Sequence, residues 1–405
     1  MPFKQSSAMP SARGLRRRRW AASTAACAAL TTGLVTGPAA HAAPPAAEPE
    51  VAASAPANTP DRYQTTLDDL VTVDQFPGAL ASVHDAKGTV RNYTAGVADI
   101  ETGKAIKPDA PVRIASNTKT FTATVVLQLV QEGTISLDAP VETYLPGIVR
   151  GEGIDGRAIT IRQLLQHTSG LPDYDQVLLS EGLTSNLETY FEPRELVDAT
   201  LTLPAVGAPG ELWSYSNANY ILAGLVVQRV TGRPISEEIT ERIIEPLGLE
   251  NTYWPEVGDM TLPEDAPNGY LTETPGGPLI DVTELDPSSG WAAGQLVSTP
   301  SEANRFFVAL LGGELIGPEM LAEMKKTVPA PGGNVYVEVN AGLGLDRISL
   351  SCGDVWGHGG NVQGFTTRNG VTAEGRAATV AVTALLPTVE SLVSVEKAVE
   401  AALCS

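Results

Sequence analysis

Segments with the pattern of β-strands occur only near the two ends of this chain, and this restricts the folds open to it. A β-hairpin is predicted near the start, with strands at Gly78–Val83 and Val90–Val97 on either side of the turn Lys87-Gly88. Three strands are expected near the end, around Val355, over Gln363–Arg368 and over Ala377–Leu385. Between them, residues 137–281 carry no convincing strand pattern. The sequence therefore predicts an α/β unit built from both chain ends, with a mostly helical insertion at about residues 137–285.

Apolar residues spaced three and four positions apart predict the helices. The expected helices are one that begins at Ser116 and the segments Arg62–Val73, Ile161–Gln166, Glu195–Thr200, Tyr220–Val230, Ile235–Ile244, Ser301–Leu311 and Val389–Leu403.

The first 42 residues have the composition of an export signal. Arg16–Arg19 precede the apolar stretch Ala21–Val35, and the small residues of Ala40-His41-Ala42 suit cleavage after Ala42. We expect a signal peptide at 1–42, a flexible Ala/Pro-rich linker at 43–60, and a folded domain at 61–405. The protein would then be secreted, with no stable membrane span after processing. An uncleaved anchor is the alternative, and the arginine cluster also suits twin-arginine export.

Removal of residues 1–42 leaves 21 Lys+Arg against 47 Asp+Glu, a net charge of −26. This charge disfavours nucleic acid and anionic membranes as partners, and we expect a monomer. Only two cysteines remain, Cys352 and Cys404. In an oxidising compartment an even pair predicts a disulfide that ties the C-terminal helix to the strand region near residue 350. Two free buried thiols are the alternative.

Ser116 and Lys119 stand at the start of the apolar stretch Phe121–Val130. Residues three apart are neighbours on a helix, so a neutral lysine here can accept the serine proton and make the hydroxyl a nucleophile. The pattern Ser-x-x-Lys also arises by chance. A second copy, Ser394 to Lys397, lies in a segment that reads as an ordinary amphipathic helix.

Two further polar motifs are unique in the chain. Tyr215-Ser216-Asn217 precedes an apolar helix, and a tyrosine beside a lysine can act as a general acid or base. His358-Gly359-Gly360 follows a short apolar run, and its glycines would let a ligand approach the backbone closely. The alternatives are a partly buried aromatic residue that anchors a loop and a plain turn before a strand.

Taken in order, these motifs resemble those of penicillin-recognising serine hydrolases. The histidine in the third motif is similar to that of secreted D-alanyl-D-alanine carboxypeptidases related to class C β-lactamases. Flanking segments that also resemble the family are 159–171, 245–249 and 350–353. The resemblance covers residues 62–403 and implies a β-lactamase/transpeptidase-like fold, in which an antiparallel sheet is flanked by helices from both chain ends and carries a helical inserted subdomain.

The resemblance also implies a mechanism that needs no cofactor and no metal. Ser116 would form the acyl-enzyme, while Lys119 and Tyr215 share the proton taken from its hydroxyl. The backbone N–H groups of Ser116 and Asn361 would hold the oxyanion. Asn217 would position the acyl side. His358 would organise the Tyr215 side and help to attract a substrate carboxylate.

Departures from the family pattern concern the substrate. The carboxypeptidases carry carboxylate-binding hydroxyls where this chain has Gly359 and Asn361, so Arg347 is the candidate for the positive charge. We expect a D-Ala-D-Ala carboxypeptidase that acts on peptidoglycan-type stem peptides, with β-lactams as inhibitors or substrates. An esterase, a D-amino-acid amidase, a β-lactamase and a catalytically silent penicillin- or peptidoglycan-binding module are the alternatives. We expect a structural role for His167.

Overall fold

A computed structural model of the protein describes residues 62–334, 336–386 and 388–404. The predicted signal peptide and linker lie outside the described residues. No helix within the described part is long and apolar enough to cross a membrane.

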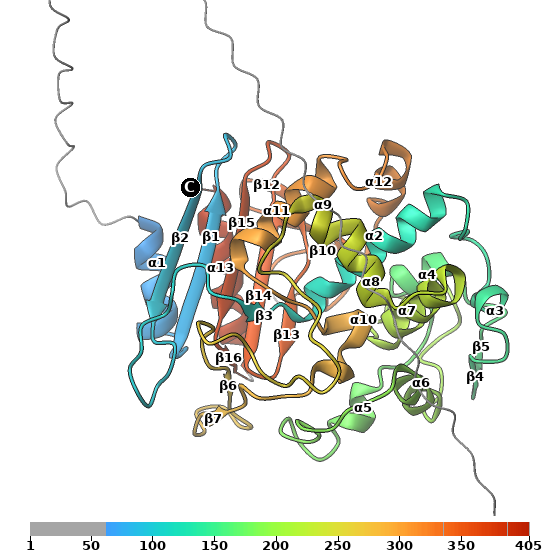
Figure 1. Ribbon diagram of the computed structural model, residues 1–405, viewed down its shortest axis with the longest axis horizontal. Coiled ribbons are helices and arrows are strands. Elements are labelled where there is room, and N and C mark those ends of the chain that lie inside the picture. Colours follow the sequence, from blue (N-terminus) through green and yellow to red (C-terminus); the bar gives the residue numbers. More distant parts are fainter. Residues whose placement is uncertain (1–61, 335, 387, 405) are drawn as a thin grey trace, which may run out of the picture. The chain divides into compact units, whose positions relative to one another are not determined.

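The central feature is an antiparallel sheet in which strands from the two ends of the chain lie side by side (Figure 1). Its order is β2-β1-β15-β14-β12-β11-β10-β9, with β13 paired to β14. The strands are β1 (Gly78–His84), β2 (Val90–Gly96), β9 (Val328–Pro329), β10 (Val339–Ala341), β11 (Asp346–Leu350), β12 (Gly353–Gly357), β13 (Gly360–Val362), β14 (Phe365–Val371) and β15 (Ala377–Val382). The predicted fold class is confirmed.

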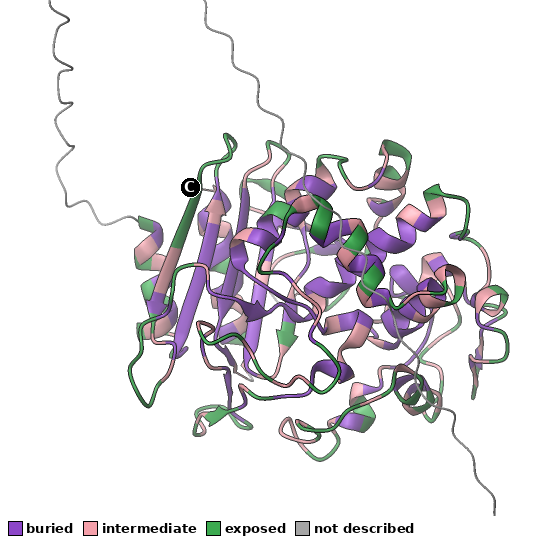
Figure 2. Ribbon diagram, viewed as in Figure 1, coloured by how far each residue is buried: buried purple, intermediate pink, exposed green. Residues whose placement is uncertain are grey.

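The middle of this sheet is buried on both faces, as the purple strands in Figure 2 show. Alternate residues of a strand point to opposite faces. Ala79 and Ala81 of β1 therefore enter one apolar core, while Leu80 enters the other. The first core is covered by α1 (Arg62–Thr72) and α13 (Val389–Cys404), and α11 (Pro300–Leu311) packs on the other face.

The helical insertion is confirmed between the two halves of the sheet. Its helical elements are α3 (Val141–Tyr144), α4 (Ile161–Leu165), α5 (Asp175–Leu178), α6 (Pro193–Leu201), α7 (Ala218–Thr231), α8 (Ile235–Ile239), the π-helical turn η2 (Thr240–Ile244) and α9 (Glu245–Leu247). It also contains short strands that the sequence did not predict: β4 (Arg150–Gly151), β5 (Ile154–Asp155), β6 (Tyr270–Leu271) and β7 (Ile280–Asp281). Two-residue strands are too short to show an alternating pattern.

The remaining elements join the insertion to the sheet. They are β3 (Val112–Arg113), η1 (Ala115–Asn117), α2 (Thr118–Gln131), η3 (Pro287–Ser289), α10 (Trp291–Gly294), β8 (Val297–Ser298), α12 (Pro318–Met324) and β16 (Ala384–Leu385). The predicted strand Ala377–Leu385 is thus divided, because β16 leaves the large sheet and pairs with β6.

Helix α2 is enclosed on nearly every side, which explains the threonines in its apolar sequence. Thr120 donates a hydrogen bond to the carbonyl of Gly344 at 2.7 Å, and Thr122 donates to that of Ala292 at 2.8 Å. Buried hydroxyls need such partners, and here they bond the helix to neighbouring segments. The helix that carries Lys119, directly after the turn that holds Ser116, is therefore held firmly in the centre of the molecule.

The predicted disulfide between Cys352 and Cys404 is confirmed. It joins the end of α13 to the turn between β11 and β12, with the two Cα atoms 5.4 Å apart.

Candidate active site

Ser116 lies in the short 3₁₀ turn η1, immediately before α2. The preceding residue, Ala115, has a φ of 48°, a left-handed conformation that is uncommon for residues other than glycine. The Asn117 amide fixes this turn, because its Nδ2 donates to the Ile114 carbonyl and to Thr367 Oγ1, both at 2.7 Å. The turn that carries Ser116, the candidate nucleophile turn, is thereby attached to the central strand β14.

Lys119 is fully buried and its Nζ has three oxygen neighbours. They are Ser116 Oγ at 3.0 Å, Asn217 Oδ1 at 2.7 Å and the carbonyl of Ala293 at 2.8 Å. Burial lowers the pKa of Lys119 to about 7, although Asp173 and Asp175 oppose this shift. The amide and carbonyl oxygens only accept, so a neutral amine would donate to both and direct its lone pair at the serine hydroxyl.

Asn217 connects Lys119 to a pair of acidic side chains that sequence reasoning missed. Its Nδ2 lies 3.2 Å from Asp173 Oδ2 and 3.0 Å from Asp175 Oδ2, and its backbone N–H donates to Asp173. Burial raises the pKa of both carboxyl groups, that of Asp175 to about 7. Both follow directly after the 159–171 segment of the family resemblance, which is the signal that could have identified them.

Tyr215 is half-buried and stacks on His167, with ring centroids 4.3 Å apart. Burial raises the pKa of its phenol, while a hydrogen bond with the Ser116 side chain opposes the rise. The ring also lies 5.0 Å from Lys119 Nζ. The structure thus brings Ser116, Lys119 and Tyr215 together, with the phenol protonated.

His167 supports the second motif. Its Nδ1 accepts a hydrogen bond from the backbone N–H of Ser216 at 3.2 Å, and Ser216 Oγ donates to the Pro172 carbonyl at 2.9 Å. The loop from His167 to Asp175 therefore holds the segment Tyr215–Asn217 in place. This arrangement accords with the expected structural role for His167.

His358 is buried, and its Nδ1 lies 2.6 Å from the Gly359 carbonyl. A carbonyl only accepts, so Nδ1 carries the proton and Nε2 is the acceptor of the neutral ring. Burial lowers the pKa of His358 to about 3, and the charge of Lys119 acts in the same direction. The ring centroid is 6.5 Å from that of Tyr215. A neutral ring carries no charge to attract a substrate carboxylate, and the expected role of His358 toward such a group stays a prediction.

The third motif runs close to the nucleophile turn. A Cβ on Gly360 would lie 2.4 Å from the Ile114 carbonyl oxygen, so this position requires glycine. Asn361 is exposed and lines both of the cavities that reach Ser116. Asn369 links the first motif to the third. Its Oδ1 accepts from the His358 backbone N–H at 3.0 Å, and its Nδ2 donates to Asn117 Oδ1. Sequence reasoning missed this bridge because Asn369 belongs to no motif.

Arg347 does not reach the site, which corrects the prediction. Its neighbours Asp346 and Ile348 line a cavity with Ser116, whereas Arg347 lies on the other face of β11 with Nη1 3.7 Å from Asp354. Arg368 of β14 lines the cavity, but its Nε donates to Glu396. The alternation of a strand explains the error, since a shift of one position reverses the direction of a side chain.

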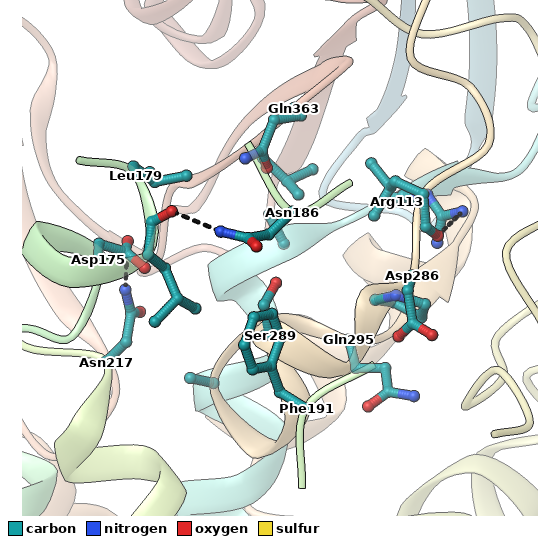
Figure 3. A pocket seen from close by; sticks show the side chains of 18 of the residues that line it. Arg113, Asp175, Leu179, Asn186, Phe191, Asn217, Asp286, Ser289, Gln295 and Gln363 are labelled. Carbon is teal, nitrogen blue, oxygen red and sulfur yellow. Dashed lines mark hydrogen bonds between the residues drawn. The ribbon is translucent and has the colours of Figure 1, made fainter. Parts of the chain in front are cut away.

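Two cavities meet at Ser116. The smaller, of about 100 Å³, extends from Asp175 and Asn217 past Phe191 and Ser289 to Arg113 (Figure 3). The larger, of about 470 Å³, contains the second and third motifs. Within the described residues, no cluster of three His, Cys, Asp or Glu side chains is placed to hold a metal ion.

The comparisons with known proteins agree with this geometry. The family described as Beta-lactamase matches residues 64–403. Penicillin-binding protein 4 of Amycolatopsis lactamdurans is 30% identical over 250 residues, which are 60% of this chain and 62% of that protein. The matched region thus spans less than two thirds of that relative's length.

Two solved structures are similar over nearly their whole length. A D-stereospecific amidohydrolase from Streptomyces sp. has a TM-score of 0.76 and 38% identity, covering 84% of this chain and 98% of its own. The D-amino acid amidase of Ochrobactrum anthropi SV3 has a TM-score of 0.75 and 30% identity, covering 84% and 96%. The chain belongs to the β-lactamase family and is a serine hydrolase of the kind that includes the penicillin-binding proteins.

Proposed function

We propose that the protein is a serine amidohydrolase that cleaves amides or peptides of D-amino acids through an acyl-enzyme on Ser116. The observation that carries this proposal is the pair Asp173 and Asp175 beside Asn217, on the wall of the larger cavity. Carboxylates at this position suit a substrate whose acyl group bears a free α-ammonium. The similarity to two D-stereospecific amide hydrolases supports the same substrate class.

In the acylation step, neutral Lys119 takes the proton of Ser116 as Oγ attacks the substrate carbonyl. The lowered pKa of about 7 makes the lysine available as the base near neutral pH. Tyr215 is the acid, because its raised pKa keeps the phenol protonated until the amide C–N bond breaks. The phenol gives its proton to the leaving nitrogen, and the proton held by Lys119 restores it. Backbone N–H groups of Ser116 and Asn361 stabilise the oxyanion.

A D-Ala-D-Ala carboxypeptidase is the second candidate, favoured by the similarity to Penicillin-binding protein 4. That reaction requires a group that holds the terminal carboxylate of the peptide. His358 is neutral, Arg347 is on the far face of β11, and Arg368 is bonded to Glu396. These observations favour the amidase over the carboxypeptidase.

The test compares D-phenylalanine amide, its L-enantiomer, N-acetyl-D-phenylalanine amide and an acylated Lys-D-Ala-D-Ala tripeptide. We expect the D-amide with a free amine to have the highest kcat/KM. At a pH above the acidic limb of the activity profile, Asp175→Asn should lower that value about tenfold. The N-acetyl substrate should be unaffected there, since only the free ammonium pairs with the carboxylate. Asp74→Asn, remote from the cavity, is the matched control. Faster release of D-alanine from the tripeptide would reject the proposal in favour of the carboxypeptidase.

We further propose that the mature protein is secreted after loss of residues 1–42, acts as a monomer and is acylated by β-lactams. N-terminal sequencing of protein from the medium, light scattering and labelling with a fluorescent penicillin test these three points. Label should appear on the Ser116 peptide. Absence of any adduct at high penicillin concentration would contradict the last point.

A further inference from the structure

The larger cavity continues beyond Tyr215 and His358 into a region with an acidic wall. Asp346 and Glu396 line this region, and Arg368 is the cationic side chain among the described residues that line it. The histidines add no charge, because burial lowers the pKa of both His167 and His358. The charge of this region therefore depends on how Arg368 is paired.

Arg368 is committed to partners within the fold. Its Nε donates to Glu396 Oε1, and its Nη1 lies 3.2 Å from the Gly360 carbonyl and 3.0 Å from Asn361 Oδ1. Glu396 is buried and also accepts from Asn334 Nδ2 at 2.8 Å. This ion pair neutralises the charge of Arg368, so no cationic side chain among the described residues that line the cavity balances the charge of Asp346.

The side chain of Asp346 has no hydrogen bond and no ion pair with any described residue, yet it lines the same cavity as Ser116. Burial, reinforced by Glu396, raises its pKa to about 7, and its charge in turn raises the pKa of Tyr215. A second polar group in the wall of the cavity is His167, which is 5% exposed. Its Nε2 has no hydrogen-bond partner among the described residues. Asp346 is half-buried, so its side chain is open to the cavity and accessible to a bound group.

We propose that Asp346 makes this region a leaving-group subsite that favours a cationic group and rejects a free carboxylate. The inference rests on the proposed function, because it takes the leaving group to be an amine. Tyr215 protonates the leaving nitrogen, so the rest of that group extends past Tyr215 toward Asp346. An ammonium there gains a charged partner, whereas a carboxylate meets an unpaired like charge. Specificity is thus set on both sides of the scissile bond by acidic side chains.

The experiment uses D-phenylalanine joined to three amines of equal chain length: 1,3-diaminopropane, 3-aminopropanamide and 3-aminopropanoate. With the wild-type protein, kcat/KM should fall in that order, with about a tenfold or larger difference between the cation and the carboxylate. Asp346→Asn should reduce this difference to about twofold, and circular dichroism checks that the variant is folded. Asp354→Asn is the control, since Asp354 lies on the next strand outside the cavity.

Inhibition of p-nitrophenyl butyrate hydrolysis by the three free amines separates this proposal from the proposed function. Failure to hydrolyse any of the three D-phenylalanine amides would reject the amidase alone. Stronger inhibition by the diamine that disappears in Asp346→Asn would still support the subsite. Preference for the carboxylate would overturn it and assign recognition to Arg368. A cation preference that is unchanged in Asp346→Asn would overturn it as well.

Discussion

The chain contains two copies of Ser-x-x-Lys on helices, and they differ completely in their surroundings. In α2, Lys119 is fully buried and its Nζ lies 3.0 Å from Ser116 Oγ. In α13, Lys397 is exposed, with its Nζ 5.6 Å from the centre of the Tyr336 ring. Ser394 donates instead to Asp74 Oδ1 at 2.7 Å. The same spacing therefore brings the serine and the lysine into contact in one copy and leaves them with separate partners in the other.

Desolvation, rather than spacing, distinguishes the lysine that could act as a base from the one that could not. A lysine in water stays protonated and cannot accept a proton from serine. Burial of Lys119 removes its amine from water and disfavours its charged form. The predictions below test this contrast, beginning with the largest expected effect.

Replacement of the two serines should separate the copies most clearly. Ser116→Ala removes the nucleophile, and we expect kcat to fall by roughly 10⁴-fold or more, as for other acyl-enzyme hydrolases. Ser394→Ala should retain full activity. Ester hydrolysis measures the activity of each variant, and mass spectrometry of the penicillin-treated proteins detects the acyl adduct. An acyl adduct that persists in Ser116→Ala would refute the assignment.

Replacement of the two lysines by arginine tests the base. Arginine keeps the charge but does not deprotonate, so Lys119→Arg should lower kcat on the order of 10³-fold. Lys397→Arg should have no effect on kcat. Steady-state kinetics with p-nitrophenyl butyrate provide the values, and circular dichroism checks that each variant folds. Equal kcat values for the two variants would show that the buried environment of Lys119 does not matter for catalysis.

Asn369→Ala tests how firmly the nucleophile turn is held. The change breaks the link between Asn117 and His358, so kcat should fall about tenfold while KM changes little, because misplacement mainly affects the transition state. Asn92→Ala, on the exposed face of β2, is the control. An increase in KM alone would mean that Asn369 supports binding rather than the nucleophile.

The pH dependence tests the charge around Lys119. Activity requires the neutral amine, so it should rise with pH through about 7, a value that belongs to the coupled lysine and carboxyl groups. Asp173 and Asp175 raise the pKa of Lys119. Asp175→Asn should therefore move the acidic limb of the kcat profile to lower pH. An uncharged ester substrate avoids any effect on ammonium binding, and a limb that moves to higher pH would contradict the electrostatics.

The smallest effect is expected at the second Ser-x-x-Lys copy, Ser394 to Lys397, and it concerns stability rather than activity. Asp74→Ala removes the partner of Ser394, and the free energy of unfolding should fall by about 1 kcal/mol, the typical value of one partly buried hydrogen bond. Activity should not change. Urea denaturation measures the free energy of unfolding. A decrease of more than about 3 kcal/mol would mean that this contact is central to the structure.

Long, periodic segments allowed most of the fold to be predicted. The hairpin β1–β2, the helices α1 and α13 and the antiparallel fold class follow from their patterns and the family resemblance. The expected helix Ile235–Ile244 changes after Ile239 into the π-helical turn η2, which no periodicity reveals. Strands β10 and β11 were missed as well. Their place in the sheet depends on pairing with distant segments, which local pattern does not contain.

The candidate nucleophile, the order of the three motifs and the disulfide partners could be read from the chain alone, because these depend on residue type and spacing. The charges of the site could be assigned only from the tertiary structure. Burial makes His358 neutral, the pleat of β11 turns Arg347 away and Asp346 inward, and the His167–Asp175 loop brings two carboxyl groups to Asn217. Protonation and direction depend on what surrounds a side chain, and residues distant in sequence supply those surroundings.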